Sequence, residues 1–434
     1  HKPRDRLLGD FDHSSFYKKR GRLIGSVRLS STAVMTEHTS SQTRWSLILL
    51  SLAIGVSVAG YVGKAPPAIP GMRAELSLSL ISAGWVVSIF SAMGSITGMM
   101  TGILADRIGR VKMILLALAT ISFGSILGAY AHSAEIILLS RLLEGAGYIG
   151  TMAILPALIA RLSSDRHRGL AVSLWSSVTP LGMAIAMVAA PAVIEPIGWR
   201  GLWWVTAGFT IFFLIIGIIS YRGIDAKTPK NKQPYWANIK KTISRPGPWL
   251  LAICFLTYTF QWMAIMVWLP TFVIEERGSG LGLAATLAAA GVIINIFGNL
   301  FGAWLVHRGA VRWLMVTIGT TIMGTTSLFI FPDLLPDLAR FGLVLVFSFF
   351  GGLQPTALLA SVPLHSPSEA QLGATNGVLY QGSQIGQLLG PPVVALVVTY
   401  TGTWEQAGWV LFLGTMINLA LAQWIRILEK PVIK

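Results

Sequence analysis

Three charged residues, Lys64, Arg141 and Glu144, stand inside long apolar stretches of this sequence. A charged side chain at the centre of a bilayer costs about 2.5–3.5 kcal/mol on insertion scales, so each such residue is a candidate for binding or ion transfer. The remaining charged residues fall in loops, in tails or at the ends of apolar stretches. These three side chains are therefore the first candidates for chemistry.

Arg141, Glu144 and Tyr148 follow one another at spacings of three and four, which places them on one face of a helix. In one interpretation, Arg141 and Glu144 only neutralise each other. In the other, the planar guanidinium of Arg141 binds an anionic substrate, and Glu144 carries a proton that is coupled to substrate binding. Both interpretations stay open from the sequence.

Lys64 lies near the end of the first apolar stretch, on the same helix face as Tyr61. Lys64 either meets the substrate in a central cavity or extends to the membrane surface, where a lysine is tolerated at little cost. If Lys64 and Arg141 both face the cavity opposite Glu144, the site has a net positive charge. Such a site favours a small anion.

Neutral polar and aromatic side chains complete the candidate site. Amides are unfavourable in contact with lipid, so amides in apolar stretches are expected to face the protein interior. We expect Gln261 and Gln384 in particular to orient the substrate by hydrogen bonds. The neutral candidates for substrate contact are Tyr61, Tyr148, Trp175, Gln261, Asn295 and Gln384.

The elements that must position these residues are membrane-spanning helices. The chain of 434 residues is 53% hydrophobic and only 12% charged, whereas a soluble domain has about 25% charged residues. Apolar stretches of 18 or more residues are long enough to cross a bilayer. Twelve are predicted, at about 46–68, 80–103, 111–131, 135–160, 169–193, 201–221, 249–273, 281–306, 312–331, 338–362, 372–399 and 404–426.

The cations of this basic chain, whose net charge is +15, are concentrated in alternate loops. If the N-terminus is cytoplasmic, most of the arginines and lysines fall in cytoplasmic loops, as the positive-inside rule requires. The charge thus predicts two cytoplasmic termini and contact with the lipid bilayer, and it does not indicate binding to nucleic acid. The single cysteine, Cys254, excludes an internal disulfide.

Residues 102–112 form a short polar segment between two apolar stretches, and residues 302–312 repeat its glycines and its basic end, with Val306 in place of Asp106. The first copy resembles the loop between the second and third helices of the major facilitator superfamily. Residues 174–182 and 374–392 are similar to its cyanate-permease-like branch. In the family this loop latches one conformation, and the residues that match it are Gly102, Asp106, Arg107, Gly109, Arg110 and Lys112.

The resemblance implies an all-α integral membrane protein with twelve transmembrane helices in two pseudo-symmetric six-helix bundles. A basic, disordered extension is expected at 1–44 and a cytoplasmic linker at 222–247. The bundles are expected at 45–221 and 248–427, and a cytoplasmic tail at 428–434.

The expected function is alternating-access transport of a small anion with proton symport, by a monomer in a bacterial-type inner membrane. A proton-coupled efflux antiporter for drugs or metabolites is the first alternative, and a non-transporting sensor or scaffold is the second. The sequence contains no catalytic or metal-binding constellation and no phosphate-binding glycine loop, so we expect neither an enzyme nor a cofactor.

Overall fold

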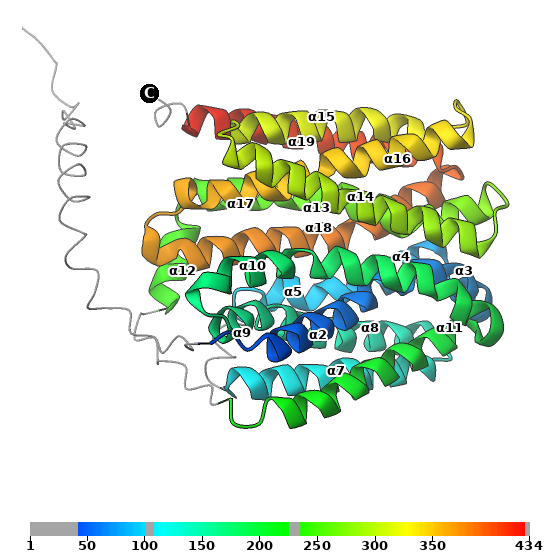
Figure 1. The fold of residues 1–434 in the computed structure, drawn as a ribbon. Coiled ribbons are helices and arrows are strands. Elements are labelled where there is room, and N and C mark those ends of the chain that lie inside the picture. Colours follow the sequence, from blue (N-terminus) through cyan, green and yellow to red (C-terminus); the bar gives the residue numbers. More distant parts are fainter. Residues whose placement is uncertain (1–41, 101–107, 225–234, 430–434) are drawn as a thin grey trace, which may run out of the picture.

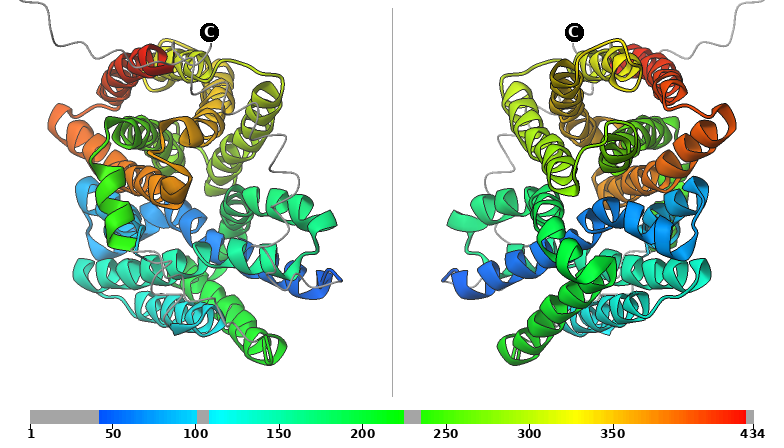
Figure 2. Two further views of the ribbon diagram at one scale, coloured as in Figure 1. Left: turned by 90° about the vertical axis from the view of Figure 1, so that its left-hand side faces the viewer. Right: turned by 90° about the vertical axis from the view of Figure 1, so that its right-hand side faces the viewer.

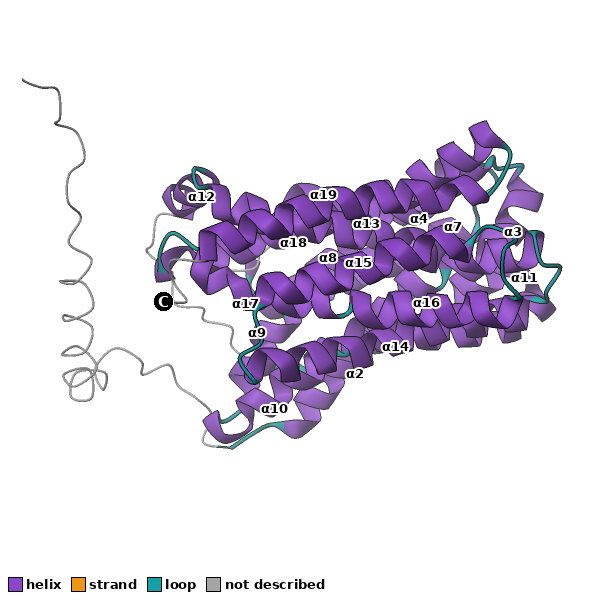
Figure 3. Ribbon diagram, turned by 90° about the horizontal axis from the view of Figure 1, so that it is seen from above, coloured by secondary structure: helices purple, strands orange, loops and turns teal. Residues whose placement is uncertain are grey.

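The computed structural model describes residues 42–100, 108–224 and 235–429, and every regular element within these ranges is helical (Figure 3). In the first part of the chain the helices are α2 (Trp45–Gly63), α3 (Ala65–Leu76), α4 (Leu80–Ser88), η1 (Ile89–Ser91), α5 (Ala92–Thr97), α7 (Arg110–Ala129), α8 (Ala134–Met152), α9 (Leu155–Leu162), α10 (Asp165–Ser176) and α11 (Val178–Ser220).

In the second part the helices are α12 (Tyr235–Ile243), α13 (Pro246–Glu275), α14 (Leu281–His307), α15 (Arg312–Ile330), α16 (Asp337–Gly351), α17 (Leu353–His365), η2 (Glu369–Gln371), α18 (Leu372–Thr401) and α19 (Glu405–Glu429). We call helices α2–α11 the N-terminal half and α12–α19 the C-terminal half. Figure 2 shows them as two groups of helices side by side.

Among the described residues, eleven helical segments are long and apolar enough to cross a membrane. The predicted count of twelve differs because the segment Asp165–Ser220 takes in two of the predicted stretches. Within it, Gly198 has φ 74° and ψ 175°, which is not helical. Such a positive φ is readily adopted by glycine and rarely by other residues, so the chain changes direction there.

The long helices run roughly parallel, so the molecule has two ends (Figure 1). We call the end at α3 the α3 end and the end at α9, α10 and α12 the linker end. Between the halves, α4 packs on α18, α11 on α14, and α3 on α13. The last contact lies at the α3 end, where Arg73 of α3 forms an ion pair with Glu275 of α13.

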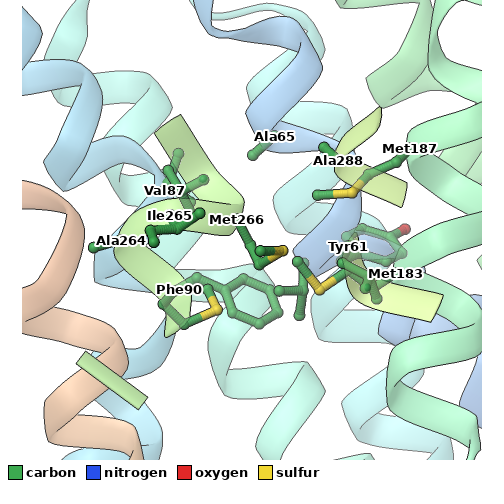
Figure 4. Packing of buried hydrophobic residues seen from close by; sticks show 14 of the residues in the cluster. Tyr61, Ala65, Val87, Phe90, Met183, Met187, Ala264, Ile265, Met266 and Ala288 are labelled. Atoms are coloured by element: carbon green, nitrogen blue, oxygen red, sulfur yellow. The ribbon is translucent and has the colours of Figure 1, made fainter. Parts of the chain in front are cut away.

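An apolar cluster also joins the two halves. Figure 4 shows Tyr61, Phe90 and Met183 from the N-terminal half together with Met266 and Ala288 from the C-terminal half. All five side chains are buried. Flexible methionine side chains fill irregular gaps between such surfaces. The halves are therefore closed against each other towards the α3 end.

Helices α13 and α18 touch along their backbones. Gly382, Gly386 and Gly390 of α18 face α13, and a Cβ atom built at any of them would lie 2.2 to 2.4 Å from a carbonyl oxygen of α13. No side chain fits in that space. This glycine seam, spaced by four residues, holds the two helices in close contact over about two turns.

Candidate functional site

Lys64 sits at a break between two helices. Helix α2 ends at Gly63, and α3 begins at Ala65 with Pro66 and Pro67 in its first turn. Proline has no backbone N–H, so it fits the first turn of a new helix but interrupts a continuing one. Lys64 is completely buried, so the interpretation of Lys64 as a residue at the membrane surface does not describe this structure.

The ammonium group of Lys64 has a full set of acceptors. Nζ donates to Oε1 of Glu144 at 2.7 Å, to the Ser125 hydroxyl at 2.9 Å and to the Thr206 hydroxyl at 3.0 Å. An ammonium group has three hydrogens to donate, so all are used. The acceptors come from α8, α7 and α11, which surround the end of α2.

Two aromatic rings also face the Lys64 ammonium group. The Tyr61 ring centroid is 4.1 Å from Nζ and the Trp203 centroid 4.3 Å. A cation over the face of such rings is stabilised by their quadrupoles, most strongly where water is excluded. Lys64 is therefore held in place by five side chains of the N-terminal half.

Arg141 approaches the same carboxylate from the other side. Its Nη1 donates to Oε2 of Glu144 at 2.5 Å and to the backbone oxygen of Tyr61 at 3.0 Å, and its Nε donates to the Val86 oxygen at 3.1 Å. The guanidinium carbon lies 4.6 Å from the Phe90 ring centroid. The remaining nitrogen, Nη2, is buried and has no hydrogen-bond partner in the structure.

We call Lys64, Arg141 and Glu144 the charged triad. All three side chains are 0% exposed, and two cations share one carboxylate. When all three are ionised, the triad has one net positive charge. A buried charge is stable only when it is paired, and an unpaired buried N–H carries a full desolvation cost. The triad therefore contains one donor without a partner, on Arg141, and one titratable carboxylate, on Glu144.

Two further candidates from the sequence adjoin the triad. The Tyr61 hydroxyl donates to the Thr206 backbone oxygen at 2.9 Å and is 2.8 Å from the Thr210 hydroxyl, so this side chain faces α11. The Tyr148 ring is 4.9 Å from the Phe90 ring, which in turn stacks on Arg141. Tyr61 and Tyr148 thus flank the triad on two sides.

Trp175 and Gln384 lie elsewhere. Trp175 packs against Gly55, nine residues before Lys64 and hence about 13 Å away along α2. Gln384 of α18 is half-buried and packs against Gly94 of α5, across the interface between the halves. Neither residue contacts the charged triad.

The two amide candidates of the C-terminal half are engaged within that half. Gln261 is fully buried and accepts a hydrogen bond from the Thr415 hydroxyl at 3.0 Å. Asn295 donates to the backbone oxygen of Ser348 at 2.7 Å. The structure therefore does not bring Gln261 or Asn295 together with Arg141.

A second buried group on α19 completes the polar core of the C-terminal half. Asn418 donates to the Gln354 side-chain oxygen at 2.8 Å, and Gln354 Nε2 lies 3.1 Å from the Met323 sulfur. Together with the Gln261–Thr415 pair we call this the amide network. It carries no ionisable group.

Ser125, Thr206, Trp203 and Phe90 contact the triad, and the sequence did not single them out as site residues. A hydroxyl in a spanning helix usually bonds to its own preceding turn, as Thr206 also does to the Leu202 oxygen at 2.9 Å. A hydroxyl in an apolar stretch is thus no specific signal. Ser125, Thr206 and Trp203 contact Lys64 from other helices, and Phe90 contacts Arg141 from η1. Such contacts between helices leave no signal in a single sequence.

Of the proposed latch, Gly102, Asp106 and Arg107 lie outside the described residues. Gly109 has φ 100° and precedes α7, whose first residue is Arg110. Lys112 is exposed on the first turn of the same helix.

Known proteins resemble this chain over most of its length. Residues 46–371 match the family model of the Major Facilitator Superfamily. The "Putative niacin/nicotinamide transporter NiaP" of Bacillus subtilis is 25% identical over 335 residues, which are 75% of this chain and 82% of that protein. The "Probable sulfoacetate transporter SauU" of Cupriavidus necator is 22% identical over 382 residues, covering 81% of this chain and 87% of its own length.

A solved structure has the same fold. It is the crystal structure of a bacterial homologue of the human lysosomal transporter Spinster in an inward-facing, unoccupied conformation. The TM-score is 0.69 at 19% identity, over 88% of this chain and 95% of that one. With the family match over three quarters of the sequence, the chain belongs to the major facilitator superfamily and is a multi-pass membrane transporter of small solutes, not an enzyme.

Proposed function

We propose that this transporter carries a small organic anion together with a proton by alternating access. The observation that supports the proposal is the charged triad, in which Arg141 has a buried nitrogen without a partner and the cations outnumber the carboxylate. A planar guanidinium recognises a carboxylate or sulfonate through two parallel hydrogen bonds. Sulfoacetate, named for one relative, is an anion of this kind.

Glu144 is the proposed proton carrier. While it is ionised, it holds Arg141 and Lys64. Protonation removes its charge and frees both cations for a substrate anion, so the proton and the anion each favour the binding of the other. When one proton and a substrate with one negative charge are both bound, the net charge of the site equals that of the empty site. That balance lets the loaded triad stay buried while the halves move.

The direction of the chain in the membrane follows from the positive-inside rule. We infer that the linker end, which carries α10, α12 and the most basic loops, is cytoplasmic, with both termini on that side of a bacterial-type inner membrane. The α3 end, closed by the Arg73–Glu275 pair, is then the outer end. The bundle boundaries at 45–221 and 248–427, the Asp106 latch and a monomeric state belong to the same proposal.

The test is uptake into proteoliposomes of nicotinate and nicotinamide, which share one ring and differ in charge, and of sulfoacetate. Each is measured with and without an inward acid gradient. We expect accumulation of an anion that collapses when the gradient is removed, and none of nicotinamide. Arg141→Ala abolishes this uptake, and Arg141→Lys, which keeps the charge but not the planar fork, retains only a fraction of it.

Different outcomes would assign the other functions. Expulsion of a neutral or cationic compound in exchange for protons would place the chain among efflux antiporters. A phenotype that survives loss of both Arg141 and Glu144, without transport of any compound, would favour the sensor or scaffold. Variants that reach the membrane and run as a single species on size-exclusion chromatography serve as the folding control.

A further inference from the structure

A cavity of about 360 Å³ opens at the linker end of the C-terminal half, away from the charged triad. It is formed by the first residues of α13 and the last residues of α17 and α19, among them Arg245, Gly247, His365 and Glu429. A volume of a few hundred Å³ is typical of small-ligand sites. The transport mechanism proposed above does not use this cavity.

The cavity lies at the level of the membrane surface. Pro246 begins one candidate span, and His365 and Glu429 end two others. Three spanning helices that start or stop together mark the boundary between the hydrocarbon layer and the headgroups. Trp249, whose indole N–H donates to the Ile243 oxygen at 2.8 Å, is half-exposed on the first turn of α13. Tryptophan is enriched at this boundary.

One wall of the cavity is suited to an anionic group. Arg245 is exposed, and no described residue forms a hydrogen bond or an ion pair with its guanidinium group. Next to it, the backbone N–H of Gly247 belongs to the first turn of α13, where helix N–H groups have no partner within the helix. A phosphate group accepts hydrogen bonds from both kinds of donor.

Another part of the lining, next to Gly247, is suited to a cation. Glu429 is only 3% exposed, and its Oε1 lies 3.4 Å from His365 Nε2. The second oxygen of Glu429 has no hydrogen-bond partner among the described residues. A buried carboxylate with a spare oxygen that lines a cavity is a strong acceptor for an ammonium group. Arg245 and Glu429 thus form a site with one charge of each sign.

The rim of the cavity is apolar. Leu364 and Leu428 line it and are 42% and 38% exposed. Ile427, beside Leu428, is 62% exposed. On a spanning helix such exposed side chains face acyl chains. A ligand that has both charges and acyl chains matches all of these surfaces.

We propose that this cavity binds the headgroup of a zwitterionic phospholipid with a primary amine, namely phosphatidylethanolamine. The phosphate accepts hydrogen bonds from Arg245 and Gly247, the ammonium donates to Glu429, and the acyl chains run past Leu364 and Leu428. Phosphatidylcholine has no N–H to donate to Glu429, and phosphatidylglycerol has no cation. The site therefore selects among lipids by the chemistry of the amine.

The proposal is tested by native mass spectrometry of the full chain, delipidated and titrated with the three lipids carrying identical acyl chains. A charge-assisted hydrogen bond stabilises by about 1.5–3 kcal/mol, so phosphatidylethanolamine is expected to bind at least about tenfold more tightly than the other two lipids. Glu429→Gln, which keeps an oxygen for His365, reduces that preference to near unity. Arg245→Gln weakens the binding of all three lipids to a similar degree, because each of them has a phosphate group.

Arg426→Gln is the matched control, since Arg426 lies on the same helix one turn from Glu429, is exposed and stacks on Trp313 outside the cavity. It is expected to leave all three affinities unchanged. Equal binding of the three lipids to the unaltered chain, or a preference that survives Glu429→Gln, would overturn the proposal. Equally tight binding of water-soluble glycerophosphoethanolamine would assign the cavity to a free metabolite and overturn the lipid assignment.

Discussion

The two halves differ in the side chains that they bury on corresponding helices: the N-terminal half buries charged groups, and the C-terminal half buries neutral ones. In the N-terminal half the first, third and fourth spans and the end of α11 supply Lys64, Ser125, the Arg141–Glu144 pair and Thr206. In the C-terminal half the corresponding spans, counted in chain order, are α13, α15, α16–α17 and α19. They supply Gln261, Met323, Gln354, Thr415 and Asn418.

The difference indicates a division of labour between the halves. An amide side chain stays uncharged at any pH and with any ligand. The amide network can therefore hold helices together, but it cannot couple a proton to a substrate. The charged triad can do both, at the cost of burying ions. Under the proposed mechanism, the N-terminal half is the half that responds to charge, and the C-terminal half is the surface against which it moves.

Removing the shared carboxylate is expected to have the largest effect. Glu144→Ala leaves Lys64 and Arg141 buried without a counter-charge, and breaking a buried pair in this way costs about 3–5 kcal/mol. We expect a large fall in the melting temperature of the purified protein in detergent. The triple variant Lys64→Met, Arg141→Met, Glu144→Leu removes all the charges and should recover much of that loss. A Glu144→Ala protein as stable as the unaltered chain would contradict the pairing.

Removing Lys64 tests the effect of its charge on anion binding without preventing folding. Lys64→Met leaves Glu144 paired with Arg141, so the triad becomes neutral and the protein should still fold. We expect the apparent affinity for the transported anion to fall about tenfold or more, which corresponds to about 1.4 kcal/mol. The matched variant in the other half, Gln261→Met, should leave anion affinity unchanged. Equal losses of anion affinity in the two variants would contradict the difference between the halves.

A variant within the amide network should have a moderate effect on stability alone. Thr415→Val removes the hydrogen bond to Gln261, and an ordinary hydrogen bond contributes about 0.5–1.5 kcal/mol. Unfolding in detergent should be shifted accordingly, while the dependence of uptake on the acid gradient stays the same. A changed pH dependence of uptake would give the C-terminal half a role in coupling.

The ion pair between the halves should have a smaller effect on stability and a visible one on conformation. Glu275→Gln weakens the Arg73–Glu275 pair, which is partly exposed and worth about 0–1 kcal/mol. We expect spin labels on α3 and α13 to report a larger share of the state that is open at the α3 end. Arg277→Gln, which affects contacts to Asp333 within the C-terminal half, is the control and should leave that share unaltered.

The smallest effect expected is a pH effect at the α3 end. Arg200, with a second hydrogen bond from Trp199, holds the pKa of the Glu75 carboxyl below its usual value of 4.5. A lowered folded-state pKa stabilises the fold above the unfolded-state value, and that contribution is lost as the pH falls through the folded-state pKa. The melting temperature of Glu75→Gln should therefore be slightly below that of the unaltered protein at pH 6, and this gap should narrow as the pH is lowered from 4.5 towards 3. A larger gap at pH 3 would contradict this assignment.

The sequence predicts the helices well and the site only in part. Apolar stretches such as 281–306 and 312–331 match α14 and α15 within a residue, because hydrophobic length is a local property. The contact between Arg141 and Glu144 is also local, since it joins positions three apart on one helix. By contrast, the contact between Lys64 and Glu144 joins two helices that are far apart in the sequence, and it depends on the packing of α2 on α8.

Some candidate residues lie away from the charged triad for the same reason. An amide in a spanning helix must face protein, but the sequence does not say which neighbour it meets. Gln261 meets Thr415 on α19 and not the interface between the halves. A helix such as α13 is buried on several faces, from Cys254 to Trp268, so its periodicity gives no direction towards the centre of the molecule.

The glycine seam between α13 and α18 has a mechanical consequence. The two backbones touch at three glycines spaced by four residues, so no side chain can enter between α13 and α18 along the stretch from Ala252 to Phe260. Pro270 lies outside this stretch, nearer to the end of α13 that carries Glu275. Helix α13 is thus fixed to α18 on the side of the cavity wall, and Pro270 provides a point of bending towards the α3 end, because proline removes a backbone hydrogen bond within a helix.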